Sequence, residues 1–429
     1  MKINALESFN TEISDIAADK SISHRFAIFS LLTQSENRAK NYLLAEDTLN
    51  TLKIIENLGA KVKREGSSVS IMPPSEILSP NCVLECGNSG TAMRLMIGFL
   101  AGVSGFFVLS GDKYLNNRPM KRICKPLSEI GAKIYGREQA NLAPLCIEGQ
   151  KLKAFDYKSE TSSAQVKTAM ILSAFRADKT SNFSEISLSR NHSENMLKAM
   201  NAPLKISDDY LSLEISPLNQ ALKAQDILIP NDPSSAFYFA LAAIILPNSK
   251  VVLKNILLNP TRIEAYKILQ KMGAKLEIKI TQNDFETIGE IHASSSELKA
   301  VEVKENIAWL IDEAPALAIA FALAKGKSKL INAKELRVKE SDRIAATVEN
   351  LKLCGVNAKE LEDGFEIEGS QIKKAKIKSY GDHRIAMSFA ILGLLCGMEI
   401  DESECIKTSF PNFIDILTKI GARIDYRIS

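Results

Sequence analysis

Amphipathic segments that end at glycine or asparagine recur along the whole chain. Apolar positions at helical spacing lead up to each of these residues, and a strand-like segment such as AKVK or AKLEI follows. The six positions are Gly59, Gly131, Asn201, Gly273, Gly355 and Gly421. Glycine and asparagine readily adopt the left-handed conformation that closes many helices, so the pattern predicts six helix ends. Successive positions differ by 72, 70, 72, 82 and 66 residues, which indicates six similar repeats.

Each repeat has room for strands and two helices, which predicts an α/β or α+β fold. Six repeats divide most simply into two domains of three. A Pro/Asn/Ser cluster in LIPNDPSSAFYF interrupts apolar sequence and marks one crossing between domains. SDIAADKSISHR is the other crossing if the N-terminus pairs with the second half, which the repeat alone does not decide. A ligand site is expected in a cleft between two such domains.

Composition narrows the class of protein. A length of 429 residues agrees with two domains, and 54 basic against 51 acidic residues favour neither nucleic acid nor another polyanion as partner. Seven scattered cysteines without a CxxC pair favour reduced thiols in the cytoplasm and disfavour a structural zinc site. The N-terminus lacks the apolar core of a signal peptide. The longest apolar stretch, from Ile307, contains Asp312, Glu313 and Pro315, which disfavours a membrane span.

The segment LECGNSGTAMRLM joins a strand end to an apolar helix through two glycines and small polar residues. Glycines let backbone amides approach a ligand, and a helix N-terminus attracts anions, so the segment is typical of a phosphate or carboxylate cradle. Arg94 lies one turn into the helix. An ordinary turn with Thr91 as the N-cap explains the segment equally well.

Two further motifs carry cations at turns. DKSISHR places Lys20, Ser21 and Arg25 before an apolar helix, where N-capping by Ser21 or Ser23 is the simpler explanation. In NNRPM, Arg118 precedes proline and is therefore expected to have an extended backbone. Each motif alone is also typical of an ordinary surface turn.

TSSAQVKTAM crowds hydroxyl and amide side chains at the start of another apolar helix. Ser163 and Gln165 would suit an anion at this helix terminus, and Ser162 or Ser163 would equally serve as its cap. SLSRNHSEN, a short way along the chain, adds Ser189 and Arg190.

The second half offers carboxylates beside cations. In IDEAPALA, either Asp312 or Glu313 is a candidate N-cap, and a carboxylate next to so much apolar sequence also suits a general base. In LRVKESDRIAA, the spacing of Lys339, Glu340 and Arg343 predicts a shared helical face for the two cations. GDHRIAM and KTSFP place Arg384 and Lys407 before apolar sequence. Together, these cations exceed what one phosphate needs and suit two small, multiply charged anions.

The set of motifs resembles one family, the 5-enolpyruvylshikimate-3-phosphate synthases. DKSISHR, CGNSGTAMR, NRPM, SSAQVKTA, IDEAPALA, LRVKESDRIAA, GDHRIAM and KTSFP follow the family order over nearly the whole chain, in a form close to the class II branch. The resemblance implies the enolpyruvyl transferase fold, with two similar domains of three βαβαββ repeats. It implies one domain at residues 1–16 with 230–429 and another at 17–229, with linkers near 16–20 and 227–232.

Such enzymes transfer the enolpyruvyl group of phosphoenolpyruvate to the 5-hydroxyl of shikimate 3-phosphate and release phosphate. The implied phosphoenolpyruvate-binding residues are Lys20, Asn88, Gly90, Arg118, Gln165, Arg343, Arg384 and Lys407. The implied shikimate 3-phosphate-binding residues are Lys20, Ser21, Arg25, Ser163, Ala164, Gln165, Arg190, Asp312 and Lys339. Catalysis is expected from Asp312 as base at the 5-hydroxyl, Glu340 at the phosphoenolpyruvate methylene, and Lys20. No metal or cofactor is implied, and a monomer is expected.

The sequence departs from the family pattern at several positions. Ala17 and Ala18 replace a common Pro-Gly, and Glu335 replaces an asparagine of class I members, which leaves that substrate contact open. Gly90 stands where some herbicide-insensitive members carry alanine, so we expect room for the inhibitor glyphosate. Two alternatives remain: a UDP-N-acetylglucosamine enolpyruvyl transferase, which uses a loop cysteine near NNRPM, and a non-catalytic phosphosugar-binding protein of the same fold. The nearest cysteine here is Cys124, on the expected following helix.

Overall fold

The computed structural model describes residues 1–425 and contains two compact units. We call Ala18–Ile229 the N-terminal unit, and Met1–Ala17 with Pro230–Ser429 the C-terminal unit. Each unit holds three four-stranded sheets. In all six sheets one edge strand is parallel to its neighbour, and the remaining pairs are antiparallel. The expected α/β fold of six similar repeats is confirmed.

The sheets of the N-terminal unit have the orders β14–β3–β5–β4, β6–β7–β9–β8 and β10–β11–β13–β12. Its strands are β3 (Asn37–Lys40), β4 (Lys61–Glu65), β5 (Ser68–Met72), β6 (Leu84–Glu85), β7 (Phe106–Ser110), β8 (Lys133–Gly136), β9 (Leu142–Glu148), β10 (Asp156–Ser159), β11 (Ser181–Glu185), β12 (Leu204–Ile206), β13 (Ser212–Ile215) and β14 (Asp226–Leu228). Its helices are α1 (Lys20–Ser30), α2 (Glu46–Asn57), α3 (Gly90–Leu100), η1 (Leu115–Asn117), α4 (Lys121–Glu129), α5 (Arg137–Ala140), α6 (Ala164–Ala174) and α7 (His192–Ala199).

The sheets of the C-terminal unit have the orders β16–β17–β15–β2, β18–β19–β21–β20 and β22–β23–β1–β24. Its strands are β1 (Lys2–Ile3), β2 (Asn10–Ile13), β15 (Lys250–Leu257), β16 (Lys275–Asn283), β17 (Thr287–Ser294), β18 (Glu302–Val303), β19 (Lys327–Leu330), β20 (Asn357–Leu361), β21 (Gly364–Glu368), β22 (Lys376–Ile377), β23 (Met398–Ile400) and β24 (Ile424–Asp425). Its helices are α8 (Pro233–Ile245), α9 (Glu264–Lys271), α10 (Ile307–Leu310), α11 (Ala314–Leu323), η2 (Lys334–Val338), α12 (Arg343–Leu353), α13 (His383–Cys396), η3 (Ser403–Thr408) and α14 (Phe413–Lys419).

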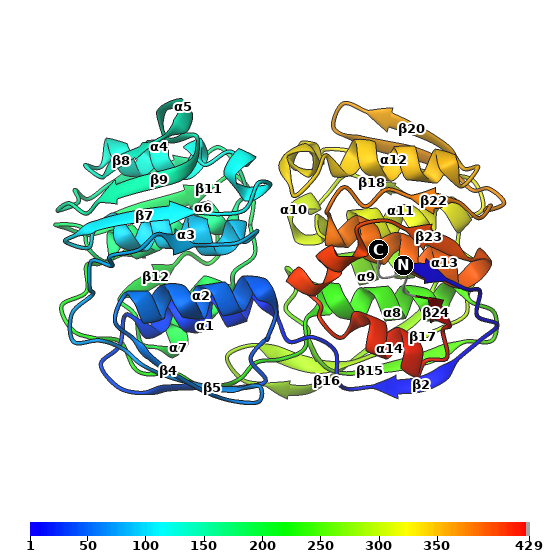
Figure 1. Cartoon of the computed structure of the whole chain (residues 1–429), viewed down its shortest axis with the longest axis horizontal. Helices are drawn as coiled ribbons and strands as arrows, with labels where there is room; N and C mark the ends of the chain where they lie inside the picture. Colours follow the sequence, from blue (N-terminus) through cyan, green and yellow to red (C-terminus); the bar gives the residue numbers. More distant parts are fainter. Residues whose placement is uncertain (426–429) are drawn as a thin grey trace. The chain divides into compact units, whose positions relative to one another are not determined.

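The apolar helices form the core of each unit. In the C-terminal unit, α8, α11 and α13 pack together and are buried along almost their whole length (Figure 1). In the N-terminal unit, α3 packs on both α1 and α6. A helix that is apolar on every side must be covered on every side, which places these helices inside and leaves the amphipathic ones outside. As a result, the polar N-termini of the buried helices are held on rigid supports.

The six predicted helix ends are confirmed. All six residues have positive φ angles, from 59° at Asn201 to 106° at Gly131. At Gly59 the amide donates to the carbonyl of Glu56 at 2.9 Å, and the next amide donates to Ile55 at 3.0 Å. These bonds satisfy carbonyls at the helix end and turn the chain into the following strand.

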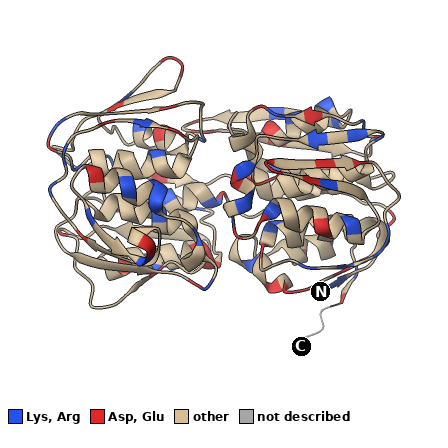
Figure 2. Ribbon diagram, turned by 90° about the horizontal axis from the view of Figure 1, so that it is seen from above, with Lys and Arg blue, Asp and Glu red and all other residues tan. Residues whose placement is uncertain are grey.

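Lysine and arginine are interspersed with aspartate and glutamate on the helices and strands of each unit (Figure 2). Among residues 1–425, no helix combines the length and apolar character needed to cross a bilayer. Within the same residues, no group of three histidine, cysteine, aspartate or glutamate side chains is arranged to hold a metal ion.

Candidate active site

The N-terminus of α3 is built by the turn Cys86–Ser89. The amide of Cys86 donates to Ser110 at 2.8 Å, and Gly87 adopts a left-handed φ of 58° while its carbonyl accepts from Asp112. Ser89 Oγ accepts from the amide of Ala92 at 3.1 Å. The expectation of Thr91 as N-cap is therefore wrong, because the helix already begins at Gly90.

Two arginines converge on Gly90. A Cβ atom at this glycine would lie 2.8 Å from Nη1 of Arg94 and 3.0 Å from Cζ of Arg118. Both side chains are almost fully buried. The positive end of the α3 helix dipole together with two guanidinium groups makes a strong anion site, so this segment suits a phosphate or carboxylate.

Gln165 connects this terminus to α6. Its Oε1 accepts from Arg94 Nη1 at 2.8 Å, and its Nε2 donates to Thr91 Oγ1 at 3.0 Å. Arg118 has the expected extended backbone, with φ −86° and ψ 138°, and donates to the carbonyl of Asn88 at 3.4 Å. The structure thus brings together Asn88, Gly90, Arg118 and Gln165.

The DKSISHR motif forms the first turns of α1. Asp19 caps the helix by accepting from the amide of Ile22 at 2.8 Å, so the expected caps Ser21 and Ser23 are wrong. Lys20 forms an ion pair with the buried Asp47 of α2. Asp19 is the N-cap because its carboxylate reaches the amide of Ile22, three residues further along the chain, and Lys20 is then the first residue of the helix.

Arg25 is buried and spans three helices. Its Nε donates to Ser193 Oγ of α7 at 2.7 Å, Nη2 donates to Thr168 Oγ1 of α6 at 3.1 Å, and Nη1 donates to the carbonyl of Ser21 at 3.1 Å. The expected shikimate 3-phosphate ligands Ser21 and Arg25 therefore lie together. The hydrogen bonds also fix α1 against α6 and α7.

His24 links the DKSISHR motif to the N-terminus of α3. Thr51 donates its hydroxyl hydrogen to the carbonyl of Asp47 at 3.2 Å, so its Oγ1 accepts from His24 Nδ1–H at 2.7 Å. Nε2 of the neutral ring then accepts from Ser89 Oγ–H at 3.2 Å. Burial, followed by the charges of Lys20 and Arg25, holds the pKa of His24 well below its usual range, which favours this neutral ring.

The start of α6 presents Ser163, Ala164 and Gln165. Ser163 caps the helix by accepting from the amide of Val166 at 3.4 Å. The preceding Ser162 donates to the carbonyl of Ser187 at 2.8 Å. Arg190 lies in the same loop as Ser187, just before α7.

In the C-terminal unit, Arg343 gathers three carboxylates. Its Nε donates to Asp382 at 2.8 Å, Nη2 donates to Glu340 at 2.6 Å, and Nη1 lies 3.4 Å from Asp312. Burial opposes the charge on Arg343, but Asp382, then Glu340 and Asp312, raise its pKa above the usual range. Arg343 in turn holds the pKa of Asp382 below its usual range despite burial. The structure thus brings both expected catalytic carboxylates, Asp312 and Glu340, to one arginine.

The expected helical face of Lys339 and Arg343 is wrong. Asp342 Oδ1 accepts from the amides of Ile344 and Ala345 at 3.1 and 3.0 Å, so α12 begins only at Arg343. Lys339 lies at the end of η2 and pairs with Glu335 at 3.6 Å. Glu335 therefore neutralises part of the charge of a residue expected to bind substrate.

The remaining expected cations, Arg384 and Lys407, lie in α13 and η3. Arg384 is buried in the first turn of α13, where its Nε and Nη1 have no hydrogen-bond partner among the described residues. Lys407 is exposed in η3. Glu313, rather than Asp312, occupies the N-cap position of α11, but its carboxylate makes no capping hydrogen bond.

Three residues of the sequence motifs contact the candidate site residues but were not expected among them: Arg94, Asp382 and His24. A signal existed for Arg94, because a charged residue inside the apolar run AMRLMIGFL needs a buried partner. Asp382 precedes the apolar helix α13 and caps it, with Oδ1 accepting from the amide of Arg384 at 2.8 Å. His24 carried no comparable signal.

The solved structures place this architecture in a known class. The enolpyruvyl transferase NikO from Streptomyces tendae is 12% identical, with a TM-score of 0.76 over 99% of this chain and 98% of that chain, so it shares the fold. An EPSP synthase from Acinetobacter baumannii is 33% identical, with a TM-score of 0.86 and 99% of each chain covered. The fold is that of the enolpyruvyl transferases.

Sequence comparison identifies the family within this class. The family model for EPSP synthase (3-phosphoshikimate 1-carboxyvinyltransferase) matches residues 3–417. A 3-phosphoshikimate 1-carboxyvinyltransferase from Campylobacter jejuni subsp. doylei is 79% identical over 99% of this chain and 100% of the relative. The protein of the same name from Campylobacter concisus is 61% identical over 100% of both. The chain belongs to the EPSP synthase family.

Proposed function

We propose that this protein transfers the enolpyruvyl group of phosphoenolpyruvate to the 5-hydroxyl of shikimate 3-phosphate, forming 5-enolpyruvylshikimate 3-phosphate and phosphate. The observation that carries the proposal is the 79% identity, over the whole chain, to a curated 3-phosphoshikimate 1-carboxyvinyltransferase. The charge clusters of both units fit a reaction between two small anions.

For phosphoenolpyruvate, the α3 terminus offers Asn88, Gly90, Arg118 and Gln165. Its amides and the neighbouring guanidinium groups suit the carboxylate and phosphate of this substrate. We assign Lys20, Arg343, Arg384 and Lys407 to the same substrate. The buried Nε and Nη1 of Arg384 fit an anionic partner, because a buried donor without an acceptor is unfavourable.

For shikimate 3-phosphate, we assign Lys20, Ser21, Arg25, Ser163, Ala164, Gln165, Arg190, Asp312 and Lys339. Ser163 and Ala164 lie at the N-terminus of α6, whose amides suit a phosphate. Fixed donors of this kind orient the substrate, which lowers the entropic part of the barrier.

The proposed chemistry is addition followed by elimination. Protonation of phosphoenolpyruvate at C3 leaves a cationic C2, and the 5-hydroxyl oxygen then adds to C2 as its proton leaves. The tetrahedral intermediate then loses a proton from its C3 methyl group and expels phosphate from C2, which restores the double bond between C2 and C3. Asp312 would take the hydroxyl proton, while Glu340 and Lys20 would transfer the proton to and from C3. Arg343, which lies 3.4 Å from Asp312 and 2.6 Å from Glu340, would keep the two carboxylates oriented.

The acceptor is tested by phosphate release from phosphoenolpyruvate in metal-free buffer, with either shikimate 3-phosphate or UDP-N-acetylglucosamine. We expect release only with shikimate 3-phosphate. Cys124 lies on α4, and burial raises the pKa of its thiol to about 12, which argues against a loop cysteine as acid. Release with UDP-N-acetylglucosamine alone would contradict the proposal.

A non-catalytic binding protein is distinguished by Asp312→Asn. In an enzyme, this change should lower kcat by about 10²–10⁴-fold and leave the affinity for shikimate 3-phosphate within an order of magnitude. The affinity is measured by isothermal titration calorimetry. Unchanged phosphate release by the variant would exclude Asp312 as the base.

We also infer that glyphosate inhibits the protein by occupying the space at Gly90. The protein is further proposed to act as a monomer in the cytoplasm. Its free thiols suit a reducing compartment.

A further inference from the structure

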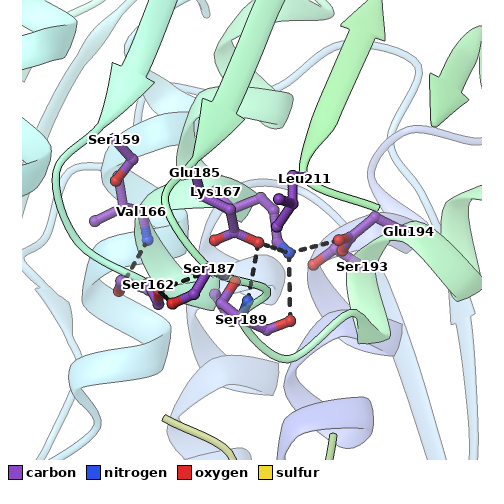
Figure 3. Close-up of polar contacts among 12 residues, drawn as sticks. Ser159, Ser162, Val166, Lys167, Glu185, Ser187, Ser189, Ser193, Glu194 and Leu211 are labelled. Carbon is purple, nitrogen blue, oxygen red and sulfur yellow. Dashed lines mark hydrogen bonds and ion pairs between the residues drawn. The ribbon is translucent and has the colours of Figure 1, made fainter. Parts of the chain in front are cut away.

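A buried ion cluster lies beside the α6 terminus. Lys167 Nζ is 2.7 Å from Glu185 Oε1 and 2.6 Å from Glu194 Oε1 (Figure 3). All three side chains are at most 2% exposed. The residues come from three elements: Lys167 from α6, Glu185 from the end of β11 and Glu194 from the first turn of α7.

One ammonium therefore separates two buried carboxylates. Its three N–H donors face Glu185, Glu194 and the carbonyl of Ser189, the last at 3.5 Å. In an interior with little water, two carboxylates repel each other strongly unless a cation lies between them. The position of Lys167 thus determines the spacing of β11 and α7 at this point. An exposed pair such as Lys205–Glu214 imposes no comparable constraint.

The cluster also fastens the loop that connects β11 to α7. The amide of Ser189 donates to Glu185 Oε1 at 2.9 Å, and its carbonyl accepts from Lys167. On the other side, Ser162 donates to the carbonyl of Ser187 at 2.8 Å (Figure 3). The loop is held against the start of α6 at both points, and Arg190 follows directly.

The next residues along α6 and α7 hold Arg25. Thr168 and Ser193 lie 2.5 Å apart, oxygen to oxygen, and both accept from the Arg25 guanidinium. Because Thr168 follows Lys167 and Ser193 precedes Glu194, the ion pair between the two helices fixes the register at which Arg25 is bound.

We propose that Lys167 is a positioning residue for shikimate 3-phosphate. Through Glu185 and Glu194 it holds the α6 terminus and the β11–α7 loop in the arrangement that aligns Ser163, Arg190 and Arg25. Lys167 itself does not touch the substrate. This inference rests on the proposed function and extends it, because it assigns substrate affinity to a cluster outside the expected binding residues.

The first test is Lys167→Met, which retains the length of the side chain but removes its charge. We expect the KM for shikimate 3-phosphate to rise on the order of tenfold or more, while kcat and the KM for phosphoenolpyruvate stay within about threefold. Lys167→Arg retains the charge and should recover part of the affinity. Equal changes in both KM values, or none, would overturn the inference.

Two further variants separate positioning from stability. Lys167→Met leaves two carboxylates buried without a cation, so the triple variant Lys167→Met, Glu185→Gln, Glu194→Gln removes all the charge and preserves folding. It should still show the raised KM, and a wild-type KM would overturn the inference. Leu172→Ala, in the buried core of the same helix, should lower Tm without changing the ratio of the two KM values. A raised ratio in Leu172→Ala would mean that any loss of stability produces the effect.

The matched surface control is Lys205→Met, which breaks an ion pair of the same kind in the same unit. It should behave as wild type, and a raised KM for shikimate 3-phosphate would overturn the inference. If the wild-type protein released no phosphate, the proposed function would fail. If the wild type is active and Lys167→Met retains its KM for shikimate 3-phosphate, only the positioning role fails.

Discussion

At the scale of single residues, we expect Gly90 to determine how closely an anion approaches the α3 terminus. A methyl group there would lie 2.8 Å from Arg94 Nη1 and 3.0 Å from Arg118 Nη1, which are the flexible ends of long side chains. We expect Gly90→Ala to fold, because these ends can move, but to displace both guanidinium groups. The KM for phosphoenolpyruvate should rise on the order of tenfold, and glyphosate inhibition should weaken further.

Steady-state kinetics at varied phosphoenolpyruvate, with and without glyphosate, check this expectation. Thermal unfolding of Gly90→Ala serves as the control for folding. An unchanged KM with unchanged inhibition would show that neither ligand occupies this space.

His24 predicts a dependence of stability on pH. Its folded pKa lies below the unfolded value of about 6.5, because burial and the cations Lys20 and Arg25, which flank it on α1, disfavour the charged ring. On α2, the nearby acid Asp47 is paired with Lys20. The neutral His24 ring therefore contributes its full share to the free energy of unfolding above about pH 6.5. This contribution is lost as the pH falls below that value and through the lowered pKa of His24. For one proton, the free energy of unfolding falls by at most about 1.4 kcal/mol per pH unit.

Urea unfolding at about pH 7.5 and about pH 5.5 tests this for the wild type and for His24→Gln, which cannot titrate at this position. The wild type should lose more stability than the variant between the two conditions. Equal losses would show that His24 does not carry the effect.

At the scale of the elements, we expect alanine to destabilise the six helix ends to different extents, depending on what surrounds each glycine or asparagine. Gly273 has a φ of 94°, and an added Cβ would meet only the Glu297 carbonyl at 3.5 Å. Gly273→Ala should therefore lower the free energy of unfolding by about 1–2 kcal/mol, the cost of a left-handed alanine. At Gly59, the Cβ would also lie 3.1 Å from Leu78, so Gly59→Ala should cost about 1 kcal/mol more.

Urea unfolding of the two variants gives the comparison, with Asn201→Gly as the control. This change preserves the left-handed conformation and should alter the stability by less than about 0.5 kcal/mol. Equal losses in Gly273→Ala and Gly59→Ala would show that crowding at Leu78 contributes nothing.

The sequence predicted where the helices end better than how they begin. A left-handed C-cap strongly selects one residue type, so Gly59 and its counterparts were identifiable from their spacing. Several residue types can cap an N-terminus, and the choice depends on which side chain reaches the amides of the first helical turn. Asp19 and Ser89 therefore cap α1 and α3 where nearby hydroxyl residues had been expected.

At the scale of the whole molecule, the motifs predicted which segments belong to the proposed site but not which side chains meet. Arg94 and Gln165 are 71 positions apart, and Arg343 and Asp382 are 39 apart, so no local pattern links them. The packing of α3 on α6 creates the first contact. The Lys167 cluster was likewise unpredictable, because its partners become neighbours only when β11 and α7 pack against α6.

The surface of the molecule predicts a monomer. Acidic and basic residues are interspersed in each unit (Figure 2). The large exposed apolar side chains Phe106, Ile186 and Ile280 lie on β7, on the loop after β11 and on β16, respectively. A stable interface buries about 800 Å² per partner around an apolar centre, which such dispersed residues do not supply. Size-exclusion chromatography with light scattering should give the mass of one chain at about 1 and about 100 μM. A mass of two chains at the lower concentration would contradict the prediction, because dimerisation that tight requires an extensive apolar surface.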